Sequence, residues 1–296
     1  MADDDALPSV SVVVPAYNEN ARIAGCIASL LAQDYPRELL RIIVVDNGST
    51  DGTFATVQSI AGIVALQERT PGSYAARNLG LRHVESDVVC FTDADCIAAS
   101  DWVRSAVRHL AGGGVGVVAG RVQLDASGGR RASASELFEK FFAFRQEQNA
   151  RANGCVTANW CSRSQLLREL GGFDATLRSG GDRDLSERIA KAGHRIVYAP
   201  DAVVHHPVRA SYAELLRKRR RLAGGLYVRS YLAGKTSFPR LLRGFANKAL
   251  RRSRELAALD GIDAVDRVRV TAVILALSLA SMLEAVRLRC GGEPLR

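Results

Sequence analysis

Short apolar runs alternate with amphipathic segments along the first 125 residues of the chain. The apolar runs are rich in Val and Ile, which favour strands, and the segments between them carry apolar residues at helical spacing. This alternation is typical of an α/β fold with a mostly parallel sheet flanked by helices. The predicted strands lie within residues 10–17, 41–53, 63–68, 87–96 and 115–122, and the predicted helices within 21–35, 71–85 and 101–113, the last with Ser100 as N-cap.

The pattern is less regular in the second half of the chain. A long helix with a Phe-rich face is predicted over residues 133–151, and a strand, a helix and a turn over 155–177. Residues 180–207 predict a helix that opens on acidic residues, followed by two apolar runs that end in paired histidines. The composition becomes basic after Arg209, so we place any change of structural role near that point.

One segment near the end of the printed sequence is apolar enough to interact with a membrane. From Val270 to Leu283 the apolar run is interrupted only by Thr271, Ser278 and Ser281. A bilayer crossing needs about 20 apolar residues, and arginines flank this segment on both sides. A buried helix, an interfacial helix and a short membrane anchor over residues 270–286 remain alternatives. The acidic first residues, MADDDALPS, indicate no signal peptide, so we expect a cytoplasmic protein that this segment could attach to the inner face of a membrane.

Composition narrows the class of protein only a little. The 296 residues are 47% hydrophobic and 24% charged, which allows an ordinary globular core. The net charge of +9 makes anionic partners plausible, but no aromatic residues interleave with the basic ones in a nucleic-acid-binding motif, so we expect no nucleic acid partner. The six cysteines lack zinc-binding spacing and predict free thiols in a reducing compartment.

Two carboxylates end one buried strand. The apolar run from Val88 to Phe91 stops at Asp93-Ala94-Asp95. Aspartates are common in turns, which is the simplest explanation. However, residues i and i+2 share one side of a strand, so both carboxylates can face one point. Hard oxygen ligands suit Mg²⁺ or Mn²⁺, and phosphates usually complete the ion's shell, so the motif also fits a metal–diphosphate complex. The neighbouring Cys96 is a less favoured ligand.

Polar clusters also follow two earlier strands. Pro15, Tyr17 and Glu19 come after the first, and Asp46 begins a polar turn after the second. Because the carboxyl ends of parallel strands form the ligand-binding edge of such sheets, we expect these clusters to meet the Asp93 motif there. The sequence G-x-G-x-x-A at 114–119 does not indicate a dinucleotide site, because a predicted helix precedes it and a strand follows.

Three later groups are chemical candidates with structural alternatives. Asp182 and Asp184 open a helix, where acidic residues stabilise the N-terminus. However, residues i and i+2 of a helix point to different sides, so one of the two can face a cleft. The two glycines before Asp182 would also let a ligand approach. His205 and His206 end a strand, whose adjacent residues face opposite ways, so at most one can share the Asp95 site. The basic run 217–221 could bind phosphate through arginine or form a solvated or membrane-facing helix surface.

With these residues in place, the chain resembles an inverting family-2 glycosyltransferase of the GT-A fold, which is Rossmann-like. The resemblance covers about residues 8–225 and rests on six segments in the family's order and spacing. They are VSVVVPAYNE (10–19), IIVVDNGSTDGT (42–53), PGSYAARNLGL (71–81), FTDADC (91–96), GGFDATLRSGGDRDLSERI (171–189) and AVVHHP (202–207).

The resemblance implies a nucleotide-diphosphate-sugar donor, with UDP favoured by its frequency in the family, and Mn²⁺ or Mg²⁺ as cofactor. The acceptor would be a glycan, a lipid or a small molecule. Asp182 matches the general base, Asp95 the metal ligand and His206 a further metal ligand, with His205 at a position often held by Tyr. The remaining implied contacts are Pro15, Tyr17, Glu19, Asp46, Gly72, Arg77 and Asp93 at the nucleotide (Asp93 also at the metal), Asn159 and Trp160 at the sugar and acceptor, and Arg217 at the diphosphate.

The chain departs from the family pattern in two places. Gly181-Asp182 stands where the family often has Glu-Asp, which weakens the assignment of the base. The QxxRW segment of processive polymerases is absent, which predicts transfer of a single sugar. Two alternatives remain. A nucleotidyltransferase would be expected to carry a glycine-rich basic loop after the first strand. A non-catalytic membrane-attached scaffold would be expected to lack the acidic residues that hold the metal or act as the base.

We therefore predict a glycosyltransferase domain over residues 1–230 and a helical extension with basic and apolar residues over 231–296. Within the first, residues 8–120 would form the nucleotide-binding half and 121–230 the acceptor half.

Overall fold

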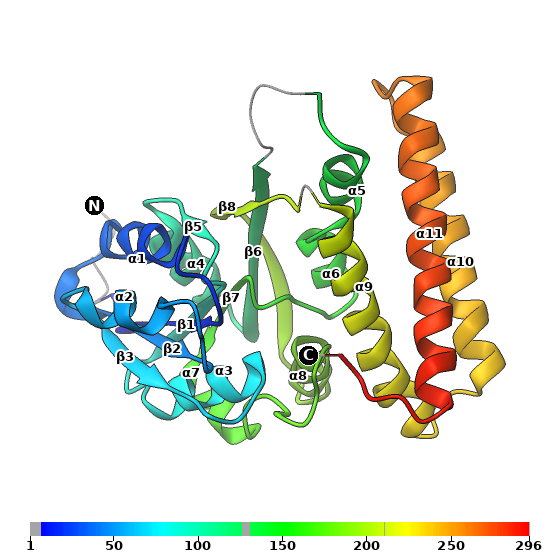
Figure 1. Cartoon of the computed structure of the whole chain (residues 1–296). Helices are drawn as coiled ribbons and strands as arrows, with labels where there is room; N and C mark the ends of the chain where they lie inside the picture. Colours follow the sequence, from blue (N-terminus) through cyan, green and yellow to red (C-terminus); the bar gives the residue numbers. More distant parts are fainter. Residues whose placement is uncertain (1–6, 126–130, 210, 296) are drawn as a thin grey trace. The chain divides into compact units, whose positions relative to one another are not determined.

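The computed structural model describes residues 7–125, 131–209 and 211–295 (Figure 1). These residues belong to two compact units. The first, here called the sheet unit, comprises residues 1–123, 144–175 and 181–206, and the second, the helical unit, comprises 124–143, 176–180 and 207–296. We describe each unit by itself.

The described strands form a mixed eight-stranded sheet in the order β3-β2-β1-β4-β7-β6-β8-β5. The strands β1 to β4 run parallel, as the alternating pattern predicts. β7 is antiparallel to both β4 and β6, and β5 is antiparallel to β8. The bounds are β1 Val10–Ala16, β2 Leu40–Asp46, β3 Val64–Gln67, β4 Val88–Thr92, β5 Ile97–Ala98, β6 Val115–Asp125, β7 Asn159–Arg163 and β8 Arg195–Pro207.

Helices cover both faces of the parallel strands, with α1 and α4 on one side and α3 and α7 on the other (Figure 1). Val12 and Val14 of β1 belong to the core cluster that includes α1 and α4. Val13 faces the other way, where Gly80 lets α3 approach so closely that a Cβ would lie 2.4 Å from the valine. The helices of this unit are α1 Ile23–Leu31, α2 Thr53–Ser59, α3 Ser73–Arg82, α4 Trp102–Leu110, α6 Gln146–Arg151, α7 Ser164–Glu169 and α8 Gly181–Lys191, with the 3₁₀ turn η1 Arg37–Leu39.

The predicted fold class is confirmed, and several local predictions are corrected. The long helix predicted over 133–151 is two helices, α5 Ala134–Phe142 and α6, because Phe144 has a φ of 45°, which a right-handed helix cannot contain. Helix α4 starts after Asp101 and not after Ser100, whose carbonyl accepts a hydrogen bond from the Asp34 amide (2.6 Å). The two apolar runs before the histidines form one continuous strand, β8, and all six cysteines are free thiols, as predicted.

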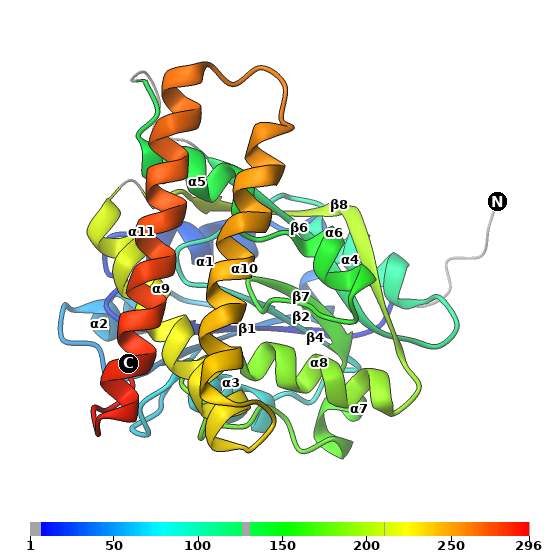
Figure 2. The same cartoon turned by 90° about the vertical axis from the view of Figure 1, so that its right-hand side faces the viewer.

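The helical unit packs α5 with four later helical elements. Helices α10 and α11 lie side by side along most of their length (Figure 2). Two apolar clusters hold the unit together, one joining α5, α9, α10 and α11 and the other joining α9 and the π-helical turn η2 to α10 and α11. The bounds are α9 Tyr212–Leu226, η2 Tyr227–Leu232, α10 Phe238–Ala257 and α11 Ala264–Arg289.

Buried carboxylates explain much of the basic run on α9. Glu139 of α5 has 1% of its side chain exposed and pairs with Lys218 (2.9 Å) and Arg209 (3.3 Å). Burial by itself raises the pKa of Glu139, but the two cations outweigh it and the net pKa is lowered. Burial likewise lowers the pKa of Lys218 to about 8, with Arg209 adding to the effect. This three-residue cluster holds α5 to α9 and to the residues that precede α9.

A second buried carboxylate lies on α11. Glu284, also 1% exposed, pairs with Arg220 of α9 (2.9 Å) and with Arg287 (2.5 Å). Next to it, the half-buried Arg219 donates a hydrogen bond to the Ser281 hydroxyl (2.8 Å). Three successive residues of the basic run, Lys218 to Arg220, therefore join α9 to its neighbours by charge-assisted contacts within the helical unit.

We expect Glu139→Gln to lower the free energy of unfolding by about 3 kcal/mol at pH 7, because it leaves Lys218 and Arg209 in the interior without their anion. This is the lower end of the range for a buried pair, since both cations keep about a quarter of their side chains exposed. The measurement is denaturant unfolding of both proteins between pH 3 and pH 8.

The pH dependence distinguishes this effect from a packing defect. The folded pKa of Glu139 lies below its unfolded value, so its contribution is present above the unfolded pKa and is lost as the pH falls through the folded pKa. The difference between the two proteins should therefore shrink in acid; a difference that is constant with pH would contradict the assignment. Glu255→Gln, which removes a surface pair with Arg251 in the same unit, should change the stability by less than about 1 kcal/mol.

Candidate functional site

The loops that follow β1 and β2 are joined by hydrogen bonds at one edge of the sheet. The Asn18 amide donates to the Ser49 hydroxyl (2.9 Å), and the Asn18 side-chain oxygen accepts from the Thr50 amide (2.8 Å). Close by, the Glu19 amide donates to the Thr53 hydroxyl (2.9 Å). The first two predicted polar clusters therefore meet, as the parallel strand order requires. Tyr17, in the same loop, is 46% exposed.

Asp46 ends β2 with a carboxylate that is fully buried. One oxygen, Oδ2, accepts the backbone amides of Gly48 and Ser49 at 3.2 Å each. The other, Oδ1, is buried and has no hydrogen-bond partner among the described residues. A buried carboxylate oxygen without a partner is costly, so Asp46 offers a strong acceptor to a ligand that brings an N–H group, once the side chain is uncovered.

Gly72 lies beside this turn. Its amide donates to the side-chain oxygen of Asn47 (2.7 Å), and its φ of 135° is a conformation that favours glycine. Apart from Gly72 and its two chain neighbours, no described residue has an atom within 4 Å of the position a Cβ would occupy. The backbone of Gly72 is thus held in place by β2 and leaves open space next to the polar edge.

Arg77 of α3 and Asp93, just after β4, form an ion pair. The guanidinium is almost wholly buried, and its Nη2 donates to Asp93 Oδ1 at 2.6 Å. Its Nε is buried without a partner among the described residues, and Asp93 keeps 32% of its side chain exposed. Arg77 therefore orients Asp93 and balances its charge while one face of the carboxylate stays open to solvent.

Asp95 lies next to His206, at the end of β8. The His206 Nε2 is 3.5 Å from Asp95 Oδ2, and the imidazole is 2% exposed and packs against the Phe144 ring, 4.5 Å between centroids. His205 points to the other face of the strand and pairs in register with Ile97 of β5. One of the two histidines shares the Asp95 site, as strand geometry predicts, and it is His206.

Asp95, His206 and Cys96 offer ligand atoms that all lie within 4.8 Å of one another. A carboxylate and an imidazole at this distance are a donor set that a divalent ion such as Mn²⁺ accepts. Burial raises the pKa of the Cys96 thiol well above its ordinary value, and the charges of Asp93 and Asp95 raise it further. The thiol is therefore the weakest candidate of the three, and the residues fit a hard or borderline divalent cation.

The side chains of Asp182 and Asp184 have different partners, as helical geometry predicts for residues i and i+2. Asp184 pairs with Arg188 (3.0 Å), and the same guanidinium donates to the carbonyls of Leu170 and Gly172, so Asp184 holds the preceding turn. Asp182 Oδ1 instead accepts from the Arg183 amide (2.8 Å) and lies 3.4 Å from the Tyr74 hydroxyl. Asp182 therefore lies beside α3, whereas Asp184 has a structural role.

The glycine before Asp182 serves the fold and not a ligand. The sequence predicts that the two glycines before Asp182 let a ligand approach, but the space that a Cβ at Gly181 would need is filled by the Tyr74 ring, at 2.9–3.0 Å. Tyr74 was not among the predicted site residues. The signal was present, because Tyr74 and Arg77 are three residues apart on one helix and therefore share a face.

Asn159 and Trp160 are buried within β7. The Asn159 side-chain oxygen accepts from the Trp102 indole (2.8 Å), and its amide group donates to the carbonyls of Arg121 (2.8 Å) and Ala202 (2.9 Å). It thereby ties β6, β7, β8 and α4 together. Trp160 packs against Phe173, 6.2 Å between centroids. These contacts account for Asn159 and for the Trp160 ring, whose Nε1 is buried without a hydrogen-bond partner among the described residues. The role of both residues at the sugar stays a prediction.

Arg217 belongs to the helical unit, where it is exposed on α9. Its neighbours Lys218, Arg219 and Arg220 make the structural contacts described above. The contact of Arg217 with a diphosphate therefore stays a prediction.

The segment that carries the ends of β1, β2 and β4 matches a known family. The family model described as glycosyl transferase family 2 matches residues 11–171. The chain belongs to this family. Membership favours a glycosyltransferase over the nucleotidyltransferase that the sequence left open.

Curated relatives of this family-2 glycosyltransferase come from several microbes. The chain is 33% identical over 226 residues to glycosyltransferase AglE of Haloferax volcanii, which covers 74% of the chain and 73% of that relative. It is 29% identical over 251 residues to an N-acetylglucosaminyltransferase of Rhizobium meliloti, covering 77% of the chain but 58% of that relative. A pre-mycofactocin glycosyltransferase of Mycobacterium tuberculosis is matched over 45% of its length at 29% identity. The chain thus spans only about half of the length of the last two.

Solved structures share the fold. A mannosyltransferase from Pyrobaculum calidifontis, in complex with GDP-Man and Mn²⁺, has a TM-score of 0.67 at 24% identity and covers 96% of this chain, with 88% of its own length matched. TarS of S. aureus, residues 1–349 in complex with UDP, has a TM-score of 0.54 at 20% identity, covering 96% of this chain and 92% of that one. The family-2 glycosyltransferase described here therefore has the fold of these enzymes.

Proposed function

We propose that this protein is a metal-dependent, inverting glycosyltransferase that moves one sugar from a nucleotide-diphosphate sugar to an acceptor hydroxyl. The observation that carries the proposal is the contact between Asp95 and His206 at the sheet edge where Arg77 orients Asp93. Carboxylate and imidazole ligands beside a carboxylate balanced by arginine suit a divalent cation that carries a diphosphate.

The nucleotide would lie along the ends of β1 and β2. The unpartnered Oδ1 of Asp46 would accept an N–H of the base, and the open space beside Gly72 would leave room for the nucleoside. Pro15, Tyr17 and Glu19 would line the pocket. UDP remains the favoured nucleotide, and GDP is the alternative because a solved structure of the same fold holds GDP-Man.

Asp95, with Asp93 and His206, would hold Mn²⁺ or Mg²⁺, which as a Lewis acid stabilises negative charge on a leaving diphosphate. Asp182 would accept the proton of the acceptor hydroxyl as that oxygen attacks the anomeric carbon opposite the diphosphate, so the configuration inverts. A positioned base contributes about 10²–10⁴-fold to such a step. Arg77 keeps Asp93 in place throughout.

The first test is thermal stabilisation by UDP, GDP, dTDP and CDP, each with and without Mn²⁺. A ligand that binds only the folded protein raises its melting temperature, so we expect one nucleotide to stabilise the wild type in a metal-dependent way. Asp95→Ala should abolish the metal-dependent part. Asp34→Ala, which removes an exposed partner of Arg104 in the same unit, should keep it. Stabilisation of the wild type by none of the nucleotides would favour the scaffold, and an unchanged shift in Asp95→Ala would refute the metal assignment.

We expect Asp182→Asn to keep nucleotide binding and to lose about 10²–10⁴-fold in turnover, because the amide cannot accept the proton. Release of nucleoside diphosphate from UDP-glucose, UDP-N-acetylglucosamine and GDP-mannose measures this with water as the acceptor. Asp184→Asn is the matched control, since Asp184 pairs with Arg188, and it should retain turnover with a modest loss of stability. Wild-type turnover in Asp182→Asn would remove Asp182 as the base.

We also propose that α11 places the enzyme on an anionic membrane surface. Among the described residues, α11 is the one helix whose length and apolarity would allow a membrane crossing, and 44% of its most apolar window is buried. Every exposed position from Ala264 to Val286 is Ala, Val or Leu. A helix face in contact with water normally carries polar residues there, so a lipid interface is the environment that this stripe fits.

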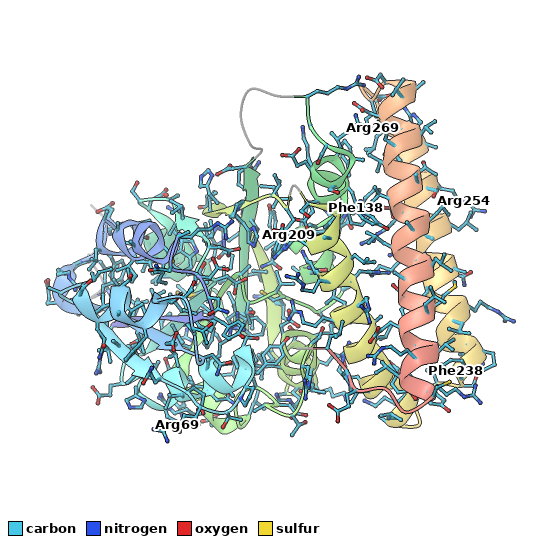
Figure 3. The ribbon with its side chains drawn as sticks, viewed as in Figure 1. Arg69, Phe138, Arg209, Phe238, Arg254 and Arg269 are labelled. Atoms are coloured by element: carbon cyan, nitrogen blue, oxygen red, sulfur yellow. The ribbon has the colours of Figure 1, made fainter. Side chains whose placement is uncertain are left out.

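The neighbouring helix supplies the charge that anionic lipids attract. The exposed side of α10 carries Arg240, Arg243, Arg251 and Arg254, spaced three, eight and three residues apart, and Arg254 is labelled on that side in Figure 3. Apolar and basic stripes on adjacent helices are typical of proteins that lie in the interface. The buried Glu284, which pairs with Arg220 and Arg287, favours a helix that stays packed on its own unit and lies on the membrane rather than crossing it.

We expect Leu279→Glu, at a position that is 57% exposed, to reduce binding to phosphatidylglycerol-containing vesicles at least tenfold, because it buries a charge in the lipid interface. Vesicle sedimentation measures this, and high salt should weaken the wild type as well. Leu222→Glu, at a 40% exposed position on α9, is the control and should bind as the wild type does. Equal binding by Leu279→Glu and wild type would contradict the proposal.

A further inference from the structure

The Tyr74 ring is fixed against the first turn of α8. It stacks on Phe173, with 5.7 Å between centroids, and on its other flank the Arg77 guanidinium lies 5.9 Å from the ring centre. Three ring atoms lie where a Cβ at Gly181 would point. A residue larger than glycine at position 181 would therefore displace the ring, which gives a physical reason for glycine directly before Asp182 in this chain.

The Tyr74 hydroxyl lies at the N-terminus of α8. It can donate to Asp182 Oδ1 at 3.4 Å, while its ring packs against the backbone of Gly181. Burial raises the pKa of Tyr74 to about 12, with the Asp182 charge adding to the rise, so the phenol keeps its proton and remains a donor at neutral pH.

We propose that Tyr74 is a positioning residue that holds the Asp182 carboxylate in its ionised form and in a fixed direction, through a hydroxyl that donates to the carboxylate from a ring packed against the start of α8. The proposal rests on the role of Asp182 as the base. It also connects the base to the nucleotide side of the site, because Tyr74 and Arg77 share a face of α3 and Arg77 orients Asp93.

The hydroxyl has two effects that can be measured separately. A hydrogen bond to a carboxylate favours its charged form and lowers its pKa, so loss of the hydroxyl should raise the pKa of the base. A hydrogen bond to a charged group also orients it, and its loss should reduce turnover even where the base is fully ionised. Neither effect should alter nucleotide binding, provided that the ring remains.

The test is Tyr74→Phe, which keeps the ring beside Gly181 and Phe173. We expect kcat for hydrolysis of the accepted nucleotide sugar to fall about tenfold, the acid limb of the kcat/KM profile to move up by about one pH unit, and the Mn²⁺-dependent Kd for the nucleoside diphosphate to stay within about twofold. Tyr35→Phe is the matched control. It removes a buried hydroxyl in the same unit that donates to the Pro8 carbonyl (2.6 Å), and it should change none of the three.

Gly181→Ala provides a second variant, because its Cβ would push the ring away from Asp182. If the hydroxyl acts through its position, Gly181→Ala should reproduce the shifted acid limb, and the double variant should be no slower than the slower single one. An unchanged acid limb in Tyr74→Phe would overturn the proposal, even if turnover fell with stability. Asp182→Asn, measured in parallel, separates the two hypotheses: wild-type turnover in that variant refutes the base, whereas its loss with a normal Tyr74→Phe refutes only the role of Tyr74.

Discussion

The pairing of two short stretches of strand holds the candidate metal site together. Strand β5 is only Ile97–Ala98, yet its antiparallel register with β8 sets His205 opposite Ile97 and Val204 opposite Ala98. Because Asp95 lies two residues before β5 and His206 one residue after the paired position, this register brings the carboxylate and the imidazole to 3.5 Å. A slip of one residue would turn His206 to the opposite face and replace it by a neighbour. The site therefore depends on backbone hydrogen bonds at the end of the sheet as much as on its ligands.

The buried carboxylates of the two units differ in their partners. In the helical unit, each of the buried carboxylates Glu139 and Glu284 meets two cations. At the sheet edge, the Asp46 Oδ1 and Arg77 Nε atoms are buried with no partner among the described residues. A buried polar atom without a partner costs free energy. A ligand that bonds to Asp46 or Arg77 would therefore stabilise the sheet edge, whereas Glu139 and Glu284 already have their partners.

Helix α3 connects the parts of the proposed reaction. Its first turn begins at Gly72, beside the proposed nucleotide pocket, and its buried Arg77 orients Asp93. Tyr74, on the same face, touches the start of α8 and Asp182. The close contact of Gly80 with Val13 anchors this helix on the central strand. A single rigid helix can therefore keep the groups for the nucleotide and for the base in a constant relation, which is what a displacement reaction needs.

The sequence by itself determined most of the strand and helix pattern of the first half, though not α2 or β5, together with the fold class and the edge at which the carboxylates gather. These follow from local periodicity and from the rule that parallel strands present their carboxyl ends together. It also identified Asp95 and a histidine at the end of a strand. Only the family resemblance favoured His206 over His205, because that choice depends on which face of β8 meets a strand about a hundred residues earlier. The same reason explains Lys218 to Arg220, which were left open as a phosphate-binding or surface run and are structural because Glu139, Ser281 and Glu284 lie next to them. It explains Gly181 too, whose need for glycine comes from a tyrosine on α3. The tertiary structure decided which buried charges are already paired, since burial and partners belong to segments that meet only after folding.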